Sequence, residues 1–282
     1  MNMSRILIVA VAVALAFASP ASALSRLGDA ERLFKFGKKA AEASQEITEE
    51  AEIQLGRGIA AQLLGARGLV QDEQLQRYVN RVGLWLALQS ERPNLPWRFG
   101  VMDSDAVNAF ALPGGVILIT RGLYDRLRDE GELAGVLAHE ISHVVDKHQV
   151  KAIKKAMGKS FATELAGEVA VQSGNEVVRH FGAQAFRVGA EVFTKGLDKQ
   201  DEYDADRNGM VLAARGGYNP FGLAGVLQTL DAVGPQDGSV SLMFSTHPTS
   251  VSRIERLEES VGERLDAYAG ASSPSRMYRP AN

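Results

Sequence analysis

The chain has 282 residues, of which 45% are hydrophobic and 23% are charged, and its formal net charge is −3. This is the composition of a globular protein with enough residues for a substantial core. The absence of a basic excess excludes nucleic acid as the main partner. Because the chain contains no cysteine, disulfides, thiolate metal ligands and a cysteine-linked lipid anchor are also excluded.

Residues 1–23 predict a secretory signal peptide. Arg5 precedes an apolar run over residues 6–18, and Ala21-Ser22-Ala23 has the small residues of a processing site. An uncleaved membrane anchor is the alternative, but the run is shorter than the roughly 20 residues that a spanning helix needs. We therefore expect export, to the periplasm if the source is bacterial, and no transmembrane segment in the mature chain.

Two amphipathic helices are expected next. The first spans residues 24 to about 64, and its lysines beside Phe34 and Phe36 are compatible with peripheral contact to a membrane surface or a partner. The commoner explanation of such a pattern is a helix that packs its apolar stripe on its own domain. The second helix is expected over residues 71–89, before Pro93.

Strand patterns are found over residues 97–102, 107–111 and 116–120, separated by turn residues. They predict a small antiparallel sheet that leads into the helices that follow. Residues 108–111 are our candidate for an exposed edge to which an extended peptide adds as a further strand. An ordinary core strand with a surface Asn108 is the alternative.

The motif His139-Glu140-Ile141-Ser142-His143 lies in a largely apolar helix expected from about Asp129 to His148. Histidines four residues apart share one helix face, so His139 and His143 can bind a single metal ion. Glu140 lies about 100° around the helix, where its carboxylate can reach a water activated by the metal. The pattern indicates the helix of a zinc hydrolase with one zinc ion per chain.

A catalytic zinc site typically has three protein ligands and an open position. The extended motif with Gly at 146 and His at 149 is rejected, because the chain has Asp146 and Gln149. His148 lies five residues after His143, on the wrong side of the helix to share the metal, and we interpret it as a helix-end or second-shell histidine.

Glu202 is the best candidate for the third ligand. It opens a later helix that carries Asp206 four residues on, so that one carboxylate can bind zinc while the other accepts the ring N–H of a ligand histidine. The alternative for the acids of residues 201–206 is a helix N-terminal cluster placed for the dipole and a cap.

Further helices are expected within residues 150–199, then over residues 220–233 and 250–261. The predicted fold is α+β and mainly helical, a zincin-type metalloprotease with the small antiparallel sheet beside the metal-binding helix. A single domain is expected over residues 24–268. The tail at 269–282, rich in Ser, Pro and Ala, is expected to be disordered.

Several motifs in this order resemble the HtpX and CAAX-prenyl-protease-like zinc metalloendopeptidases, in particular their soluble, exported bacterial members. The resemblance covers about residues 47–256. It rests on Glu52-Ile53-Gln54-Leu55-Gly56, Asn108-Ala109 followed by Pro113-Gly114-Gly115, His139 to His143, Glu202-Tyr203-Asp204-Ala205-Asp206, and His247-Pro248. The membrane helices of some members and the helical-repeat domain of others have no counterpart in this sequence, so the resemblance does not extend to their membrane substrates or scaffolding partners.

The resemblance implies zinc ligands at His139, His143 and Glu202, with Glu140 as the general base. It also implies second-shell support from Asp206 and a substrate-binding edge strand at Asn108 and Ala109. His247 matches a family histidine near the metal, which implies that it stabilises the transition state or occupies the open position in a resting form. A loop or helix-cap histidine before Pro248 is the alternative.

The sequence thus predicts a zinc-dependent endopeptidase that hydrolyses unfolded or misassembled envelope proteins, bound as an added strand. A non-cleaving zinc-binding chaperone or adaptor for envelope proteins is the first rival, but it has no need of Glu140 as a base. The second rival is a structural zinc scaffold, in which His247 would supply a fourth protein ligand and close the site.

Overall fold

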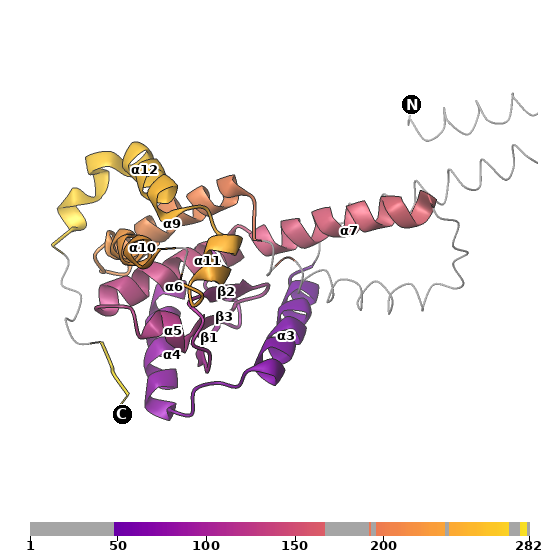
Figure 1. Ribbon diagram of the computed structural model, residues 1–282, viewed down its shortest axis with the longest axis horizontal. Coiled ribbons are helices and arrows are strands. Elements are labelled where there is room, and N and C mark those ends of the chain that lie inside the picture. The colour runs from indigo at the N-terminus through magenta and orange to yellow at the C-terminus, as the bar shows by residue number, and fades with distance from the viewer. Residues whose placement is uncertain (1–47, 167–191, 193–195, 235–236, 271–276, 281–282) are drawn as a thin grey trace, which may run out of the picture. The chain divides into compact units, whose positions relative to one another are not determined.

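The computed structural model describes residues 48–166, 192, 196–234, 237–270 and 277–280 (Figure 1). The predicted signal peptide, the segment around Phe34 and most of the segment between 167 and 195 lie outside these residues. The described part is mainly helical with one small sheet, which confirms the predicted fold class. Among the described residues, no helix is both long and apolar enough to cross a membrane.

The helices of the described part follow the expected order, with two short additions, α5 and α11. Their bounds are α3 Glu49–Ala66, α4 Glu73–Ala87, α5 Arg121–Tyr124, α6 Glu130–Val145, α7 His148–Ala166, α9 Lys199–Arg215, α10 Gly222–Val233, α11 Ser241–Thr246 and α12 Ser250–Val261, with a 3-10 helix at Gly262–Tyr268.

Aspartates begin the two helices on which the core is built. The Asp72 side chain accepts the N–H groups of Gln74 and Leu75 at the start of α4, and the Asp129 side chain accepts the N–H of Glu132 at the start of α6. Such caps satisfy N–H groups that have no partner within the helix. The helix that we predicted to continue to His148 ends at Val145.

The sheet consists of β1 (Arg98–Met102), β2 (Ala109–Leu112) and β3 (Val116–Thr120), in the order β1-β3-β2. It is mixed and not wholly antiparallel as expected: β2 pairs antiparallel with β3, whereas β1 pairs parallel with β3. The short turn between β2 and β3 makes those two strands antiparallel. β1 then joins the far side of β3, which leaves β2 at the edge.

Glycines in the β2–β3 turn allow α3 to pack directly on it. Gly114 has φ +74°, and a Cβ at this position would lie 2.4 Å from the Ile53 Cα. The Gly114 N–H donates to Glu52 Oε1 at 3.1 Å, and both Glu52 carboxylate oxygens accept from Arg92. The motif that begins at Glu52 therefore joins α3 to the turn.

Helix α3 lies on one side of the sheet and α4 and α6 on the other (Figure 1), so its two faces bury different clusters. One face packs on α3 through Leu55, Ile59, Phe110, Leu112 and Leu118. The other face packs on α4 and α6 in the larger cluster, which includes Ile117, Ile119 and Leu137. Every residue of α6 from Gly131 to Val144 is buried. The metal-site motif therefore lies at the centre of the core.

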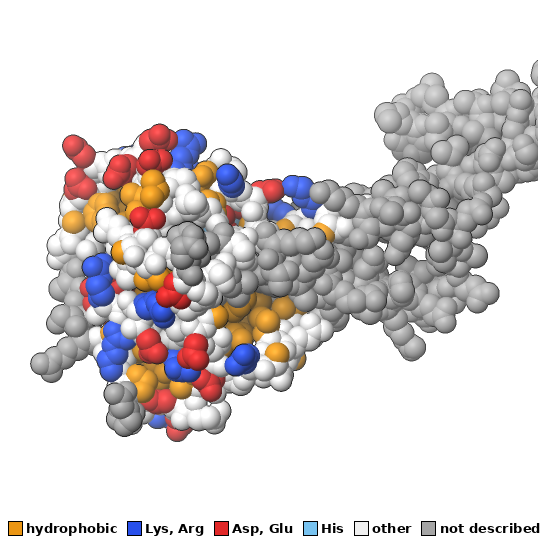
Figure 2. All heavy atoms as spheres, in the orientation of Figure 1, with side chains coloured by type: hydrophobic (Ala, Val, Ile, Leu, Met, Phe, Trp, Pro, Cys, Tyr) orange, Lys and Arg blue, Asp and Glu red, His pale blue; other side chains and the backbone are white. Residues whose placement is uncertain are grey.

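Part of the tail that we expected to be disordered is packed on the core. Met277 is 6% exposed, the Tyr278 hydroxyl donates to Asp72 Oδ2 at 2.9 Å, and the Tyr124 hydroxyl donates to the Tyr278 carbonyl. Apolar and aromatic contacts hold these residues, and composition alone does not reveal them. On the face in Figure 2, charged side chains of both signs are interspersed with hydrophobic ones.

Candidate metal centre

Two buried histidines on α6 point their ring nitrogens at one position. His139 and His143 are one helical turn apart and are 3% and 1% exposed. Their Nε2 atoms lie 3.1 Å apart, and their rings meet edge to face with centroids 4.6 Å apart. The spacing of four residues, which places both side chains on one face, therefore brings these nitrogens together.

Glu202 on α9 approaches the same point. Its Oε1 lies 3.6 Å from His143 Nε2, and its Oε2 lies 3.8 Å from His139 Nε2. Helix α9 approaches α6 closely because Gly209 faces the α6 backbone. A Cβ at Gly209 would lie 2.9 Å from the backbone nitrogen of His139. One ligand atom from each of the three residues lies within 4.8 Å of the others.

The three groups fit a metal ion. Donors on a tetrahedral ion with bonds near 2.0–2.1 Å would lie about 3.3 Å apart, close to the distances found. The Glu202 Oε2 atom is buried and has no hydrogen-bond partner among the described residues. Burial raises the pKa of Glu202 well above its ordinary value and lowers the pKa of both histidines. The imidazoles are therefore neutral, and a cation would compensate the orphaned carboxylate.

Asp206 and Arg253 contact His139 at Nδ1, the ring nitrogen that does not face the other candidate ligands. Asp206 Oδ1 lies 2.9 Å from His139 Nδ1, and the Arg253 guanidinium binds both Asp206 oxygens, at 2.5 and 2.9 Å. Burial alone would raise the pKa of Asp206, but the Arg253 charge outweighs it and keeps that pKa below its ordinary value. An ionised Asp206 orients the ring so that His139 Nε2 faces the other ligand atoms.

Arg253 is 3% exposed and was not predicted from the sequence. The sequence nevertheless contained an indication of its burial. Arg253, Leu257 and Val261 follow one another at intervals of four residues and share the buried face of α12. A charge on such a face requires a buried partner. Only the structure identifies that partner as Asp206.

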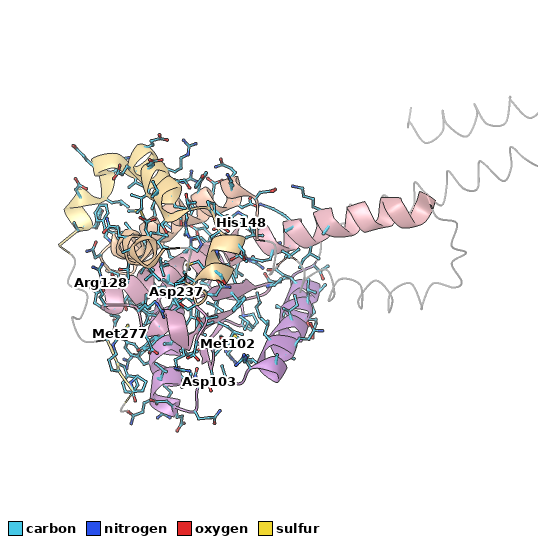
Figure 3. All side chains as sticks on the ribbon, viewed as in Figure 1. Met102, Asp103, Arg128, His148, Asp237 and Met277 are labelled. Carbon is cyan, nitrogen blue, oxygen red and sulfur yellow. The ribbon has the colours of Figure 1, made fainter. Side chains whose placement is uncertain are left out.

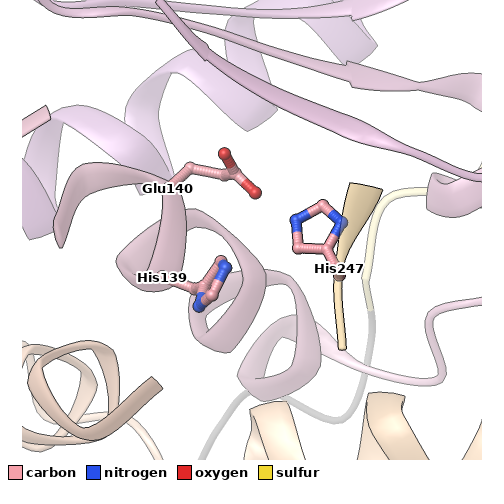
Figure 4. Close-up of side chains that lie close together, drawn as sticks. All are labelled: His139, Glu140 and His247. Carbon is pink, nitrogen blue, oxygen red and sulfur yellow. The ribbon is translucent and has the colours of Figure 1, made fainter. Parts of the chain in front are cut away.

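Glu140 lies beside the three candidate ligands and faces the sheet. Its carboxylate accepts the backbone N–H of Ala111 in β2, and burial raises its pKa to about 8. Together with His139 and His247 it forms a second group whose ligand atoms lie within 4.8 Å of one another. Figure 4 shows its carboxylate directed between the two histidine rings.

His247 follows α11 and completes the surroundings of the ligand cluster. Its Nε2 lies 3.7 Å from Glu202 Oε2, and its ring centroid lies 6.0 Å from that of His139. Its Nδ1 lies 2.9 Å from the Thr246 hydroxyl oxygen. Burial lowers the pKa of His247 to about 3, which leaves the ring neutral.

Asn108 and Ala109 lie at the start of the edge strand β2. The Asn108 backbone pairs with Thr120 of β3, whose N–H donates to the Asn108 carbonyl at 3.0 Å. The Asn108 side chain is 1% exposed, and its Oδ1 has no hydrogen-bond partner among the described residues. The alternative of an ordinary core strand with a surface Asn108 therefore does not hold, and β2 lies at one edge of the sheet, as expected for the candidate edge strand.

Comparison with protein families matches residues 73–261 to peptidase family M48. The match includes all the groups that converge at the centre and ends at the last residue of α12. The resemblance based on the ordered motifs is thereby confirmed.

Curated relatives agree with this match. The chain is 27% identical over 231 residues to a beta-barrel assembly-enhancing protease from Yersinia pestis, covering 81% of this chain and 47% of the relative. It is 30% identical over 190 residues to the mitochondrial metalloendopeptidase OMA1 of Schizosaccharomyces pombe, covering 66% and 53%. A protease HtpX homolog from Salinibacter ruber is 29% identical over 207 residues, covering 61% and 71%. The chain spans about half the length of the first two.

Proposed function

Because the chain belongs to peptidase family M48 and is a metalloendopeptidase, we propose that it uses zinc to hydrolyse unfolded or misassembled envelope proteins. One observation carries this proposal. His139, His143 and Glu202 converge on a single position, and Glu140 stands beside them against the edge strand. This combination provides three ligands and a base next to a surface that can hold a peptide.

The ligand set suits zinc, which accepts two imidazoles and one carboxylate and keeps a further position for water or substrate. When bound, zinc supplies Lewis acidity, which acidifies water and polarises a peptide carbonyl. Glu140 takes the proton of the attacking water at its carboxylate and returns it to the leaving amine. Asp206 and Arg253 keep the His139 ring fixed during these steps.

The free edge of β2 is the proposed substrate site. Backbone groups alternate along a strand, and Asn108 directs its carbonyl to β3, so Ala109 and Ala111 direct theirs to the free edge. The Val107 N–H, on that same edge, donates to the Ser239 carbonyl at 2.7 Å. The carbonyls of Ala109 and Ala111 would therefore accept N–H groups of a peptide, beside Glu140, which binds the Ala111 N–H. The unpartnered Asn108 Oδ1 would accept a backbone N–H of that peptide.

The proposed role of His247 is to stabilise the transition state. Its Nε2 faces Glu202 across the ligand cluster, where a donor would steady the negative charge that develops on the carbonyl oxygen. His247→Ala should then lower kcat more than it raises KM. A rise in activity would show instead that His247 occupies the open position in a resting form.

The envelope assignment rests on two observations outside the centre. The predicted leader over residues 1–23 has a charged start, an apolar run and a small-residue processing site, which supports export to the periplasm. Relatives from Yersinia pestis and Escherichia coli are named for enhancing the assembly of beta-barrels. Proteins of the bacterial envelope are therefore the proposed substrates.

Zinc content measured beside cleavage of unfolded casein tests the proposal against its rivals. Stoichiometric zinc with cleavage supports the protease. Zinc without cleavage would favour the non-cleaving chaperone or adaptor, or, if His247→Ala also weakens zinc binding, a closed structural site.

Substrate trapping tests the envelope assignment. Glu140→Gln, expressed in the native compartment, should retain partly unfolded envelope proteins that the active parent releases as fragments. Equal capture by the parent and by Glu140→Gln would contradict this assignment.

A further inference from the structure

A short turn between α6 and α7 places a histidine next to one of the candidate ligands, on the side away from the other ligands. α6 ends at Val145, Lys147 adopts a left-handed conformation with φ +56°, and α7 begins at His148. Side chains other than glycine seldom adopt this conformation. The break turns the chain at Asp146 and Lys147, so that His148, labelled in Figure 3, lies beside His143 of α6.

The His148 ring contacts the Nδ1 edge of the His143 ring, which points away from the ligand cluster. The two Nδ1 atoms lie 2.8 Å apart, with ring centroids 5.0 Å apart. At this distance one nitrogen donates and the other accepts, so a single proton lies between them. His143 Nε2 lies 3.1 Å from His139 Nε2 and must offer a lone pair to a metal. The His143 proton is therefore on Nδ1.

The remaining polar contacts of His148 agree with the role of acceptor. If His148 Nδ1 accepts, its own proton is on Nε2. That nitrogen faces Asp201 Oδ1 at 3.6 Å and Asp146 Oδ2 at 4.0 Å. Asp146 is itself held by the Asn208 amide at 3.0 Å. Carboxylates from the α6–α7 junction and from α9 thus lie where a ring N–H would be favoured.

The two candidate ligand histidines are held in different ways. Asp206, fixed by Arg253, faces His139 Nδ1, whereas an imidazole faces His143 Nδ1. We propose that His148 is a positioning residue for the metal site, which fixes the tautomer and the ring orientation of His143 so that its Nε2 is presented to zinc. This inference rests on the metal site of the proposed function but not on peptide cleavage.

A matched pair of variants tests this role. His148→Leu and His148→Asn have side chains of similar size and shape, but only asparagine offers an acceptor close to the position of Nδ1. Removing such a partner of a ligand histidine typically costs about 10- to 100-fold in metal affinity. We expect a loss of this size in the zinc affinity of His148→Leu, measured by competition with a chelator. His148→Asn should recover most of it.

The Co²⁺-substituted protein provides a second readout. The visible absorption of bound Co²⁺ should change in His148→Leu and return toward the parent spectrum in His148→Asn. Equal zinc affinity and unchanged spectra in both variants would overturn the proposal. If the parent binds zinc without cleaving casein, the proposed function fails while the comparison of the two variants still decides the role of His148.

Nuclear magnetic resonance of the parent keeps the proposal testable if His148→Leu does not fold. With the five histidines labelled with ¹⁵N, the zinc-loaded protein should show a proton on His143 Nδ1 and none on His148 Nδ1. A coupling between these two nitrogens across the hydrogen bond is also expected. A proton on His148 Nδ1, or a bare His143 Nδ1, would overturn the proposal.

Discussion

Arg253 places a buried guanidinium behind the candidate metal ligands. It binds both oxygens of Asp206, and its Nη2 lies 3.4 Å from His139 Nδ1. Burial would lower the pKa of Arg253, but Asp206 more than compensates and raises it. The pair therefore stays ionised inside the core, where Asp206 Oδ1 lies 2.9 Å from His139 Nδ1.

Arg253→Met should destabilise the metal-free protein by about 3–5 kcal/mol, because Asp206 would remain as an uncompensated buried charge. Arg256→Met on the same helix is the matched control. Arg256 forms an exposed ion pair with Glu259, so its loss should cost less than about 1 kcal/mol. Urea unfolding gives the free energy of unfolding of both variants. Similar losses in the two would show that Arg253 does not compensate the buried charge of Asp206.

Glu140 should make the metal-free protein less stable as the pH rises. Its pKa is 4.5 for an ordinary glutamate and about 8 when buried here, so between these values the folded protein binds more protons than the unfolded one. The stabilisation from the protonated group is complete below pH 4.5 and is lost as the pH rises through 8.

The free energy of unfolding of the chelator-treated parent should therefore fall relative to that of Glu140→Gln, by at most about 1.4 kcal/mol per pH unit. Using the difference between the two proteins removes the titration of the buried histidines, which both share. A constant difference from pH 5 to 8 would show that the burial of Glu140 does not raise its pKa.

At the scale of elements, the packing of α3 on the β2–β3 turn sets the position of the edge strand. A Cβ at Gly56 would lie 1.7 Å from the Pro113 carbonyl oxygen, whereas a Cβ at Gly65 would have no neighbour within 4 Å. Both glycines are in α3. They therefore separate the effect of helix propensity from the effect of close packing.

Gly56→Ala should destabilise the protein by about 1–3 kcal/mol, because α3 must move away from the turn. Gly65→Ala should leave stability unchanged or raise it by up to about 1 kcal/mol through helix propensity. Guanidinium unfolding compares the two. If Gly56→Ala is as stable as Gly65→Ala, α3 does not pack on the turn as described.

Sequence patterns predicted most of the elements and the side chains that meet at the metal centre, through the spacing of His139 and His143 and the acids at Glu202 and Asp206. They did not predict how the strands pair or how α6 ends. The parallel pairing of β1 with β3 could not be read from three strand patterns, because their order in the sheet depends on the turn and on α6. The contact between His148 and His143 depends on the break at Lys147, which the apolar pattern of the helix does not reveal.

Across the molecule, the C-terminal residues join the start of α4 to the end of α5. Tyr278 donates to Asp72, which caps α4, and its ring centroid lies 6.1 Å from that of Tyr78. Arg279 lies over the Tyr124 ring. The Ser, Pro and Ala of the tail predicted disorder, but Met277 is buried and Tyr278 is hydrogen-bonded to Asp72 and Tyr124.

Shortening the chain to end at residue 276 should lower stability by about 2 kcal/mol, roughly the value of burying one large apolar side chain. Shortening it to end at residue 280 keeps these contacts and serves as the control. Thermal unfolding compares the two with the full chain. Identical melting temperatures for all three would show that residues 277–280 do not stabilise the core.

In the proposed mechanism, Glu140 acts as the base beside a zinc ion held by His139, His143 and Glu202. Glu140→Gln tests it most directly, with Glu73→Gln on the exposed face of α4 as the control. Both variants should bind one zinc ion per chain with parent-like affinity. Glu73→Gln should cleave casein at the parent rate, whereas cleavage by Glu140→Gln should fall by at least about 100-fold. Parent-like cleavage by zinc-loaded Glu140→Gln would show that Glu140 is not the base.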